Sequence, residues 1–341
     1  MIQNFKEMAH FMYIKMNTVN ACEVISWTEQ AAKTIKPVFH ICIVGTIVHI
    51  LFWIQIFAYP AVPRWSMQWL CAYLTTDLLL LARFFLLYIY RWWPICLPHV
   101  FHTIICYCEA ISDNYLNLLQ SYILLALNIC RYCQIAHSHN VYSSNRHAII
   151  IAHLLIYILP LFSHIMAIKF GWTVLQNPPG DACDLLGISF TIRIVFLLLS
   201  YFIPVILTLV FVSLSLNYVR NTDGITTQQL VDARHKYHRQ IVFQSTVFYS
   251  FWILLWSPHI LIFPFYYKSS AIGIIAQKLN YISIILDPIV IATLDVRFLQ
   301  QWRSTVDHLQ NYVRRHQSIQ VPVILSTNSS DRATETNEDN K

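Results

Sequence analysis

The sequence is poor in glycine and in charged residues. Its 341 residues include only six glycines, so the glycine-rich loops that bind phosphates in nucleotide-binding folds have no support. No repeat of roughly 20 to 50 residues predicts a solenoid. Charged residues make up 12% of the chain, and the net charge of +6 comes from scattered basic residues that are not stacked with aromatics. Nucleic acid is therefore not a predicted partner.

The first 36 residues do not predict a secretory signal peptide. This segment has no basic start, no apolar run and no small-residue cleavage site, and it contains several charged residues, among them Lys6, Glu7 and Lys15. Of the nine cysteines, most lie in apolar runs, where a free thiol is usually a small buried hydrophobe. Only Cys183 lies in a clearly polar segment.

Long apolar runs are what the chain has in abundance. Hydrophobic residues make up 56% of it, which is more than a soluble domain can bury in one core. Seven runs are long enough to cross a bilayer as helices. They cover about residues 37–59, 67–90, 100–134, 148–168, 189–216, 239–266 and 274–293. Because the period-2 alternation of barrel strands is absent, we predict an all-α membrane protein with a seven-helix bundle.

The distribution of lysine and arginine predicts the orientation. An odd number of spans puts the two termini on opposite sides, and the segments after the first, third and fifth runs and after the last run hold the excess of basic residues. The positive-inside rule then predicts an extracellular tail at 1–36, a membrane domain at 37–293 and a cytoplasmic C-terminus. Residues 294–306 predict an amphipathic helix on the inner membrane surface, and 307–341 predict a largely disordered tail.

The third run carries polar residues at helical spacing. Asp113, Asn117 and Gln120 recur on one face, and in lipid such a stripe must face the interior of the bundle. About 37 Å of helix separates Cys106 from Arg131, which is enough to cross a bilayer with its interfaces. The run is therefore predicted to line a cavity and to reach both membrane surfaces.

An ordered set of residues lies across the runs: Asp77 in the second, Cys106 and Arg131-Tyr132 in the third, Pro204 in the fifth, Trp256-Ser257-Pro258 in the sixth and Asp287-Pro288 in the seventh. This set resembles the rhodopsin-like (class A) G-protein-coupled receptors over residues 37–305, as a divergent invertebrate-type member. Other positions depart from the family pattern. Cys130 replaces the acidic residue before Arg131, Ile291 replaces an aromatic residue, His238 stands where an acidic partner of the arginine often lies, and the fourth run lacks its tryptophan. These changes remove the usual restraint on Arg131.

The resemblance implies a disulfide and a ligand pocket. It implies a bond between Cys106 and Cys183, although Cys108 and Cys96 are competitors by sequence alone. It also places Asp113 where many members pair a carboxylate with a ligand cation, with Tyr281 as its support and Trp256 beneath the cavity. A second interpretation stays open, because Arg83, Arg193 or Lys278 could neutralise Asp113 within the protein. The pocket would then favour an anionic or peptide carboxylate. Glu109, near the loop, is expected to be solvated.

Two further sites follow from the resemblance. Asp77, Gln120 and Asp287 form a candidate sodium site; the alternative is a protonated structural pair of carboxyl groups. At the inner end, Arg131 and Tyr132 are expected to meet a transducer, while Pro258, Asp287 and Pro288 belong to the switching helices.

The resemblance implies a plasma-membrane receptor without enzymatic activity. It would bind an extracellular small cation or peptide and activate a heterotrimeric G protein through outward motion of the sixth helix. The alternative is a multi-span transporter or proton-moving protein, which the intramembrane carboxylates suggest. Against it, no paired inverted halves are visible. Apart from a candidate bound sodium ion, no cofactor is expected.

Overall fold

The computed structural model describes residues 23–24, 26–58, 67–93, 96–137, 146–176, 182–222, 229–262, 265 and 271–294, with isolated positions at 307, 310, 311 and 314. The chain divides into two compact units, Met1–Ile291 and Ala292–Lys341, and the site described below belongs to the first. The predicted surface helix at 294–306 and nearly all of the predicted tail lie outside the described residues.

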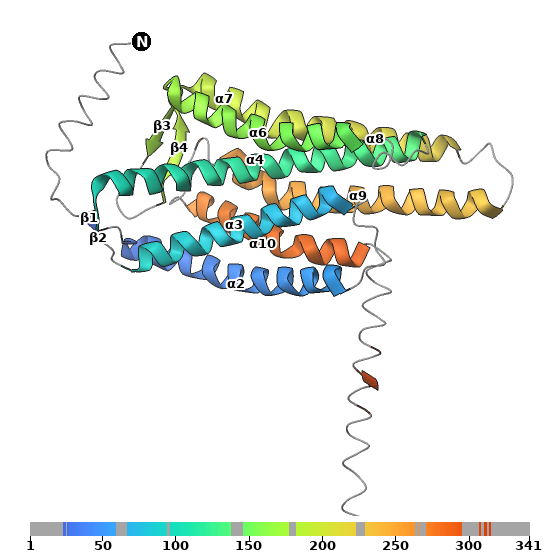
Figure 1. Cartoon of the computed structure of the whole chain (residues 1–341), viewed down its shortest axis with the longest axis horizontal. Helices are drawn as coiled ribbons and strands as arrows, with labels where there is room; N and C mark the ends of the chain where they lie inside the picture. The colour runs from blue at the N-terminus through green and yellow to red at the C-terminus, as the bar shows by residue number, and fades with distance from the viewer. Residues whose placement is uncertain are drawn as a thin grey trace, which may run out of the picture. The chain divides into compact units, whose positions relative to one another are not determined.

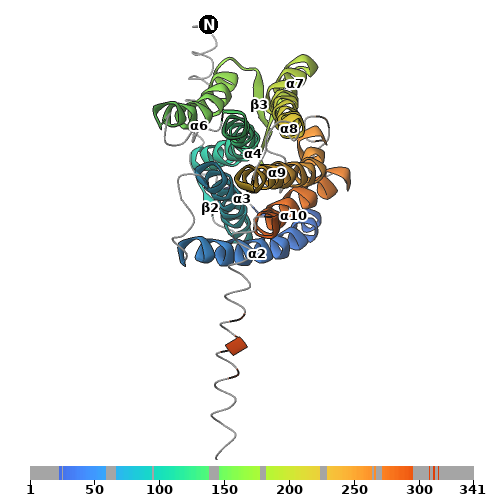
Figure 2. The same ribbon diagram turned by 90° about the vertical axis from the view of Figure 1, so that its right-hand side faces the viewer.

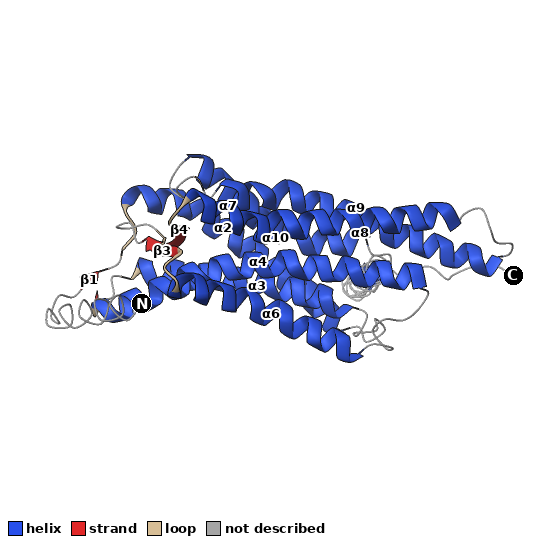
Figure 3. Ribbon diagram, turned by 90° about the horizontal axis from the view of Figure 1, so that it is seen from above, coloured by secondary structure: helices blue, strands red, loops and turns tan. Residues whose placement is uncertain are grey.

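Long helices follow the predicted apolar runs and alternate in direction along the chain (Figures 1 and 3). They are α2 (Glu29–Ala58), α3 (Gln68–Trp92), α4 (His99–His137), α6 (Arg146–Lys169), α7 (Phe190–Leu197) continuing through the π-helical turn η2 (Leu198–Phe202) into α8 (Ile203–Thr222), α9 (Gln229–Ile262) and α10 (Ala271–Leu294). We call the end of the bundle where α4 begins the disulfide end, and the end where α4 finishes the Arg131 end.

Six of these helical stretches are long and apolar enough to cross a membrane. They are the stretches in α2, α3, α6, α7 to α8, α9 and α10, so the chain has the helices of a multi-pass membrane protein. The remaining predicted span, the third along the chain, corresponds to α4. Among the described residues it does not meet the same standard of length and composition. The polar residues of α4 lower its hydropathy: Glu109, Asp113, Asn117, Gln120 and Asn128 all lie in it and are buried.

Several helices extend beyond the apolar runs that predicted them. Helix α2 begins at Glu29 rather than near residue 37, because Thr28 caps it: the amide of Ala31 donates to Oγ1 of Thr28 at 3.3 Å. Glu29 and Lys33 then form an exposed i,i+4 pair at 2.7 Å. Similarly, α9 begins at Gln229, ten residues before the predicted run. Polar helical extensions of this kind carry no hydropathy signal.

Two small antiparallel sheets lie at the disulfide end. Strand β1 (Glu23–Val24) pairs with β2 (Cys96–Leu97), and β3 (Thr173–Gln176) pairs with β4 (Asp184–Gly187). Gly171 makes the turn from α6 into β3 with a φ of 68°. Glycine adopts this left-handed conformation at a helix C-terminus, and the amide of Trp172 bonds back to the carbonyl of Ala167 at 2.9 Å.

Helix α4 is the centre of the bundle. It packs against α3, α6, α8 and the β3–β4 hairpin, and in the end-on view of Figure 2 it lies between α3, α6 and α8. In contrast, α2, α6 and the α7–α8 segment expose long rows of apolar side chains such as Ile47, Leu154 and Ile206. In a membrane protein these rows face lipid, so the buried polar residues of α4 face the protein interior.

Neighbouring helices satisfy carbonyls that prolines leave without a backbone partner. Pro288 cannot donate to the carbonyl of Ile284, and Nε2 of His49 on α2 donates to it instead at 2.9 Å. Pro204 follows the π-helical turn η2, whose i to i+5 pattern leaves the carbonyl of Leu199 without a donor, and this carbonyl accepts from the hydroxyl of Tyr122 on α4 at 3.0 Å. In lipid each unsatisfied carbonyl would be costly, so these side chains make the prolines tolerable.

The tryptophan missing from the fourth run has a counterpart on another helix. Trp69 on α3 is fully buried and stacks on the ring of His153 on α6, with ring centroids 3.8 Å apart. His153 in turn stacks on Tyr157 of its own helix. An aromatic contact between the second and fourth long helices is thus present, with the tryptophan on the second.

Candidate functional site

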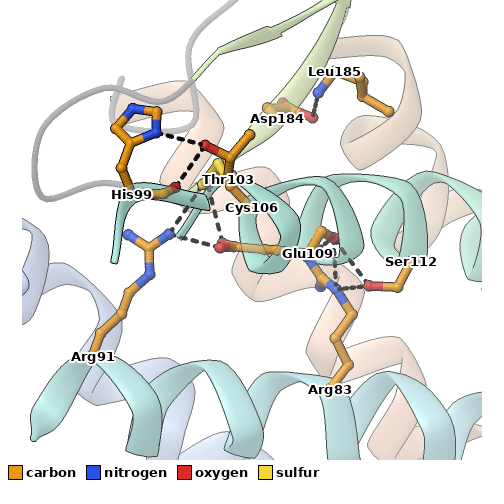
Figure 4. The surroundings of a disulfide bond; sticks show 10 residues. Arg83, Arg91, His99, Thr103, Cys106, Glu109, Ser112, Asp184 and Leu185 are labelled. Atoms are coloured by element: carbon orange, nitrogen blue, oxygen red, sulfur yellow. Dashed lines mark hydrogen bonds and ion pairs between the residues drawn. A yellow bond between two sulfur atoms is a disulfide. The ribbon is translucent and has the colours of Figure 1, made fainter. Parts of the chain in front are cut away.

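The disulfide joins Cys106 at the start of α4 to Cys183 just before β4, the pair implied by the family resemblance. Both cysteines are buried, and with Ala110 they form a small core that Leu175 and Leu185 of the β3–β4 hairpin cover. The hairpin is therefore fixed covalently against the first two turns of α4, as Figure 4 shows.

A buried ion pair reinforces this attachment. Nη2 of Arg91, at the end of α3, lies 2.6 Å from Oε2 of Glu109, and Oε1 of Glu109 accepts from the backbone amide of Cys183 at 3.1 Å. The guanidinium also lies over the ring of Trp27, 4.7 Å from its centroid. The expectation that Glu109 is solvated is therefore wrong, because Arg91 and the amide of Cys183 provide partners for a carboxylate that is only 4% exposed.

Asp113 is paired within the protein. Nη1 of Arg83 lies 2.9 Å from Oδ1 of Asp113, and the same guanidinium donates to Oγ of Ser112 at 3.0 Å and to the carbonyl of Glu109 at 3.2 Å. Arg83 thus holds three groups within about one turn of α4, and Figure 4 shows its bonds to Glu109 and Ser112. This arrangement matches the interpretation in which a cation of the protein itself neutralises Asp113.

Asn117 connects three helices one turn further along α4. Its Nδ2 donates to the carbonyl of Asp113 at 2.8 Å, while its Oδ1 accepts from Nε1 of Trp256 on α9 at 3.2 Å and from Nδ2 of Asn280 on α10 at 3.5 Å. Trp256 is fully buried and stacks on Trp252 with centroids 4.2 Å apart. A movement of α9 relative to α4 would therefore change the hydrogen bond between Trp256 and Asn117.

A cavity of about 480 Å³ lies beside these residues, within the range of small-molecule binding sites. Residues of α4, α6, α7, η2, α9 and the β3–β4 hairpin form its walls. Of the predicted ligand-binding residues, Asp113, Asn117 and Trp256 line it. Arg83 does not line it but pairs with Asp113 from α3.

Tyr281 and Lys278 are not among the cavity-lining residues. Tyr281 is buried against the ring of Phe84, with centroids 5.1 Å apart, and it lies within electrostatic reach of both Arg83 and Asp113. Lys278 is half-buried on α10. The structure therefore brings together Asp113, Asn117 and Trp256 at the cavity and leaves these two residues outside it.

A layer of buried polar residues lies further toward the Arg131 end. Nε2 of Gln120 donates to Oδ1 of Asp77, and the hydroxyl of Tyr73 donates to Oδ2 of Asp287 at 2.7 Å. Oδ2 of Asp77 and Oε1 of Gln120 have no hydrogen-bond partner among the described residues. Two such oxygens beside a second carboxyl group suit a hard cation such as sodium. No group of three or more His, Cys, Asp or Glu side chains that could hold a metal is found in the described part of the chain.

At the Arg131 end, a neutral hydroxyl holds the arginine. Nη1 of Arg131 donates to Oγ of Ser245 on α9, and the ring of Tyr132 packs near that of Phe211 on α8 with centroids 5.7 Å apart. A buried cluster of Ile135, Val219 and Val242 joins the same three helices. Pro258 lies within α9 between the cavity-lining residues Trp256 and His259.

No protein-family model matches this chain, and no curated protein matches it. The resemblance to rhodopsin-like receptors therefore rests on the residues named above and on their arrangement.

Sequence reasoning missed Arg91, Ser245, Tyr73 and Asn280 as members of these clusters. Each is a polar residue inside or at the end of an apolar run, and polar residues at membrane depth call for a partner. That signal identified Asp113, but it does not say which helix supplies the partner. His164 and Thr173 also line the cavity; Thr173 lies outside the apolar runs, so this signal does not mark it.

Proposed function

We propose that this chain is a plasma-membrane receptor of the rhodopsin-like G-protein-coupled class. Its cavity binds an extracellular ligand at the disulfide end, and its Arg131 end activates a heterotrimeric G protein when α9 swings outward. The N-terminal tail is extracellular in this proposal. Its partners are the ligand, the G protein and membrane lipid.

The observation that carries the proposal is the sequence of contacts along α4. Its first third holds the disulfide, its middle third lines the cavity and contacts α9 and α10 through Asn117, and its last third bonds to α9 through Arg131. One rigid helix therefore contacts α9 both at the cavity and at the opposite end. A ligand that alters the contact of Trp256 with Asn117 would bias the arrangement of α9 at Arg131.

The low hydropathy of α4 is compatible with a seventh span. The helix has 39 residues, which is roughly 58 Å at 1.5 Å per residue. Its acidic and amide side chains are buried against other helices rather than exposed, and polar residues that face the interior of a bundle are tolerated in membranes. A central helix needs less apolar surface than its neighbours, because it touches little lipid.

The hydroxyl of Ser245 supplies the restraint that the replaced acidic residues would otherwise supply. In the resting arrangement Arg131 is bonded across to α9, and release of this bond frees the arginine to meet the G protein. The polar layer of Asp77, Gln120 and Asp287 would hold a sodium ion midway between the two ends, and the cation would balance the two carboxylates.

A ligand screen with a promiscuous G-protein reporter tests the proposal. Cells that express the full chain should respond to some component of an extracellular ligand library, and the response should disappear in Arg131→Ala while surface expression is unchanged. Tyr115→Phe is a matched control on the same helix, because its hydroxyl bonds to the carbonyl of Tyr157 on α6 and its side chain does not line the cavity. An active Arg131→Ala variant would contradict coupling through this arginine.

The second candidate function is a transporter or proton-moving protein. It is favoured by Oδ2 of Asp77, which lies near Asp287 and has no hydrogen-bond partner in the described part of the chain. It predicts substrate flux or current in vesicles without any G protein, lost in Asp77→Asn. Receptor function predicts no current in the same vesicles.

A further inference from the structure

The formal charges around the cavity cancel. Two carboxylates, Asp113 and Asp184, lie in its walls, and Arg193 lies there as well. Arg83, behind the wall, neutralises Asp113, while Nε of Arg193 donates to the carbonyl of Gly187 at 2.9 Å. With two acids and two guanidinium groups, the cavity presents no excess of either sign, so neither a cation nor an anion is the occupant that it favours.

One side of the cavity opens toward lipid. Leu155, Leu159 and Phe162 of α6 line it and are yet 50%, 56% and 55% exposed, and Leu199 of η2 lines it with 48% exposure. A residue that both lines a cavity and is half-exposed lies at its rim. These four side chains lie on the apolar surfaces of two membrane-spanning helices, so the rim between α6 and η2 faces the hydrocarbon.

Two residues of the cavity wall carry a buried polar atom without a hydrogen-bond partner among the described residues. They are His164, through Nε2, and Thr173, through Oγ1. His164 is only 9% exposed, and its ring stacks on Phe196 with centroids 6.3 Å apart. A buried polar atom without a partner is unfavourable, and a bound molecule with one hydrogen-bonding group would relieve this.

We propose that the cavity binds an uncharged, largely apolar molecule that enters from the bilayer between α6 and η2. One hydroxyl, carbonyl or amide group of this molecule bonds to Nε2 of His164 and Oγ1 of Thr173. The proposal rests on the proposed function, because it takes this molecule to be the receptor's activating ligand. It replaces the small cation that the position of Asp113 suggested.

Photolabelling of the purified full chain in lipid nanodiscs tests the ligand class. The probe is hexadecanol with a diazirine in its chain, and two matched probes end in trimethylammonium or carboxylate. The alcohol should label the wall of the cavity in α6 and η2 at least about fivefold more than either charged probe, and unlabelled hexadecanol should compete. Equal or stronger labelling of these segments by a charged probe overturns the proposal.

Variants at the rim and at the polar atoms test the route and the bonding group. Phe162→Trp narrows the rim and should slow labelling, whereas Ile158→Trp on the same helix, at a residue that is exposed but does not line the cavity, should not. His164→Phe keeps an aromatic ring and should raise the alcohol concentration at half-maximal labelling by about fivefold, the size of one neutral hydrogen bond. His164→Gln should restore part of the lost affinity. Equal effects of the two tryptophan variants, or none from His164→Phe, overturn the proposal.

Nucleotide exchange on the same nanodiscs separates this proposal from the proposed function. Selective labelling without exchange on any added G protein supports the ligand class and contradicts receptor activity. Exchange that is driven by a charged, water-soluble ligand and lost in Arg131→Ala, without labelling of the cavity by the alcohol, overturns the ligand class and leaves the receptor function standing.

Discussion

The two ends of α4 are attached to the bundle by different kinds of contact. At the disulfide end, a covalent bond and two buried ion pairs, Arg83 with Asp113 and Arg91 with Glu109, fix α4 to α3 and the hairpin. At the Arg131 end, Arg131 of α4 donates to the neutral hydroxyl of Ser245 on α9. Beside it lies the small apolar cluster of Ile135, Val219 and Val242.

This difference determines where a conformational change is least costly. Removing one partner of a buried ion pair costs about 3–5 kcal/mol, whereas a hydrogen bond between a charged and a neutral group contributes about 1.5–3 kcal/mol. The disulfide end therefore acts as the fixed part of the bundle. The Arg131 end is the part that a ligand of modest affinity could rearrange.

The largest predicted effect is at the disulfide end. Glu109→Gln leaves the charge of Arg91 buried beside a neutral amide, and it should lower the free energy of unfolding by about 3 kcal/mol, measured as a lower thermal midpoint in nanodiscs. Glu29→Gln is the control, because it removes an ion pair of similar length whose side chains are mostly exposed and should leave the midpoint unchanged. If both variants lower the midpoint equally, the buried pair is not what holds this end.

At the Arg131 end we expect an intermediate effect, on activity. Ser245→Ala removes the acceptor of Arg131 and should raise basal nucleotide exchange by about tenfold, which corresponds to one charge-assisted hydrogen bond. Ser250→Ala lies on the same helix, but its hydroxyl bonds to the carbonyl of Thr246 within α9, so its basal exchange should match the wild type. Unchanged exchange in Ser245→Ala would show that this bond does not restrain the resting state.

The smallest predicted effect lies between the ends, at the contact of α2 with α10. His49→Leu leaves the carbonyl of Ile284 without a partner and should lower the free energy of unfolding by about 1–2 kcal/mol. In a Pro288→Ala background the residue at 288 regains a backbone N–H that can donate to this carbonyl. In that background His49→Leu should therefore lower the free energy of unfolding by clearly less. A double-variant cycle of thermal midpoints measures the difference, and equal costs in both backgrounds would contradict the role assigned to His49.

The sequence predicted the positions of the helices but not the partners of their polar residues. Apolar runs located each long helix, because burial and lipid exposure both select apolar side chains. The polar extension of α2 to Glu29 carries no such signal. The resemblance supplied the pair of Cys106 and Cys183, and the spacing on α4 identified Asp113 and Asn117.

The contacts between helices could not be derived from one sequence. Three cations were candidate partners of Asp113, and the choice of Arg83 depends on how α3 is rotated against α4. Glu109 was expected to be solvated because its helix begins nearby, but α3 ends with Arg91 at the same level. Ser245 has no charge and no motif, so only its position opposite Arg131 reveals it.

Distances between spin labels test most directly whether the Arg131 end moves while the disulfide end stays fixed. One pair of labels at the exposed positions His147 on α6 and Arg239 on α9 reports on the Arg131 end, and a second pair at Lys169 and Phe265 reports on the disulfide end. With the exposed free Cys108 replaced by serine, Ser245→Ala should add a longer distance to the first pair and leave the second unchanged. A shift at the disulfide end, or no shift at either end, would contradict the account.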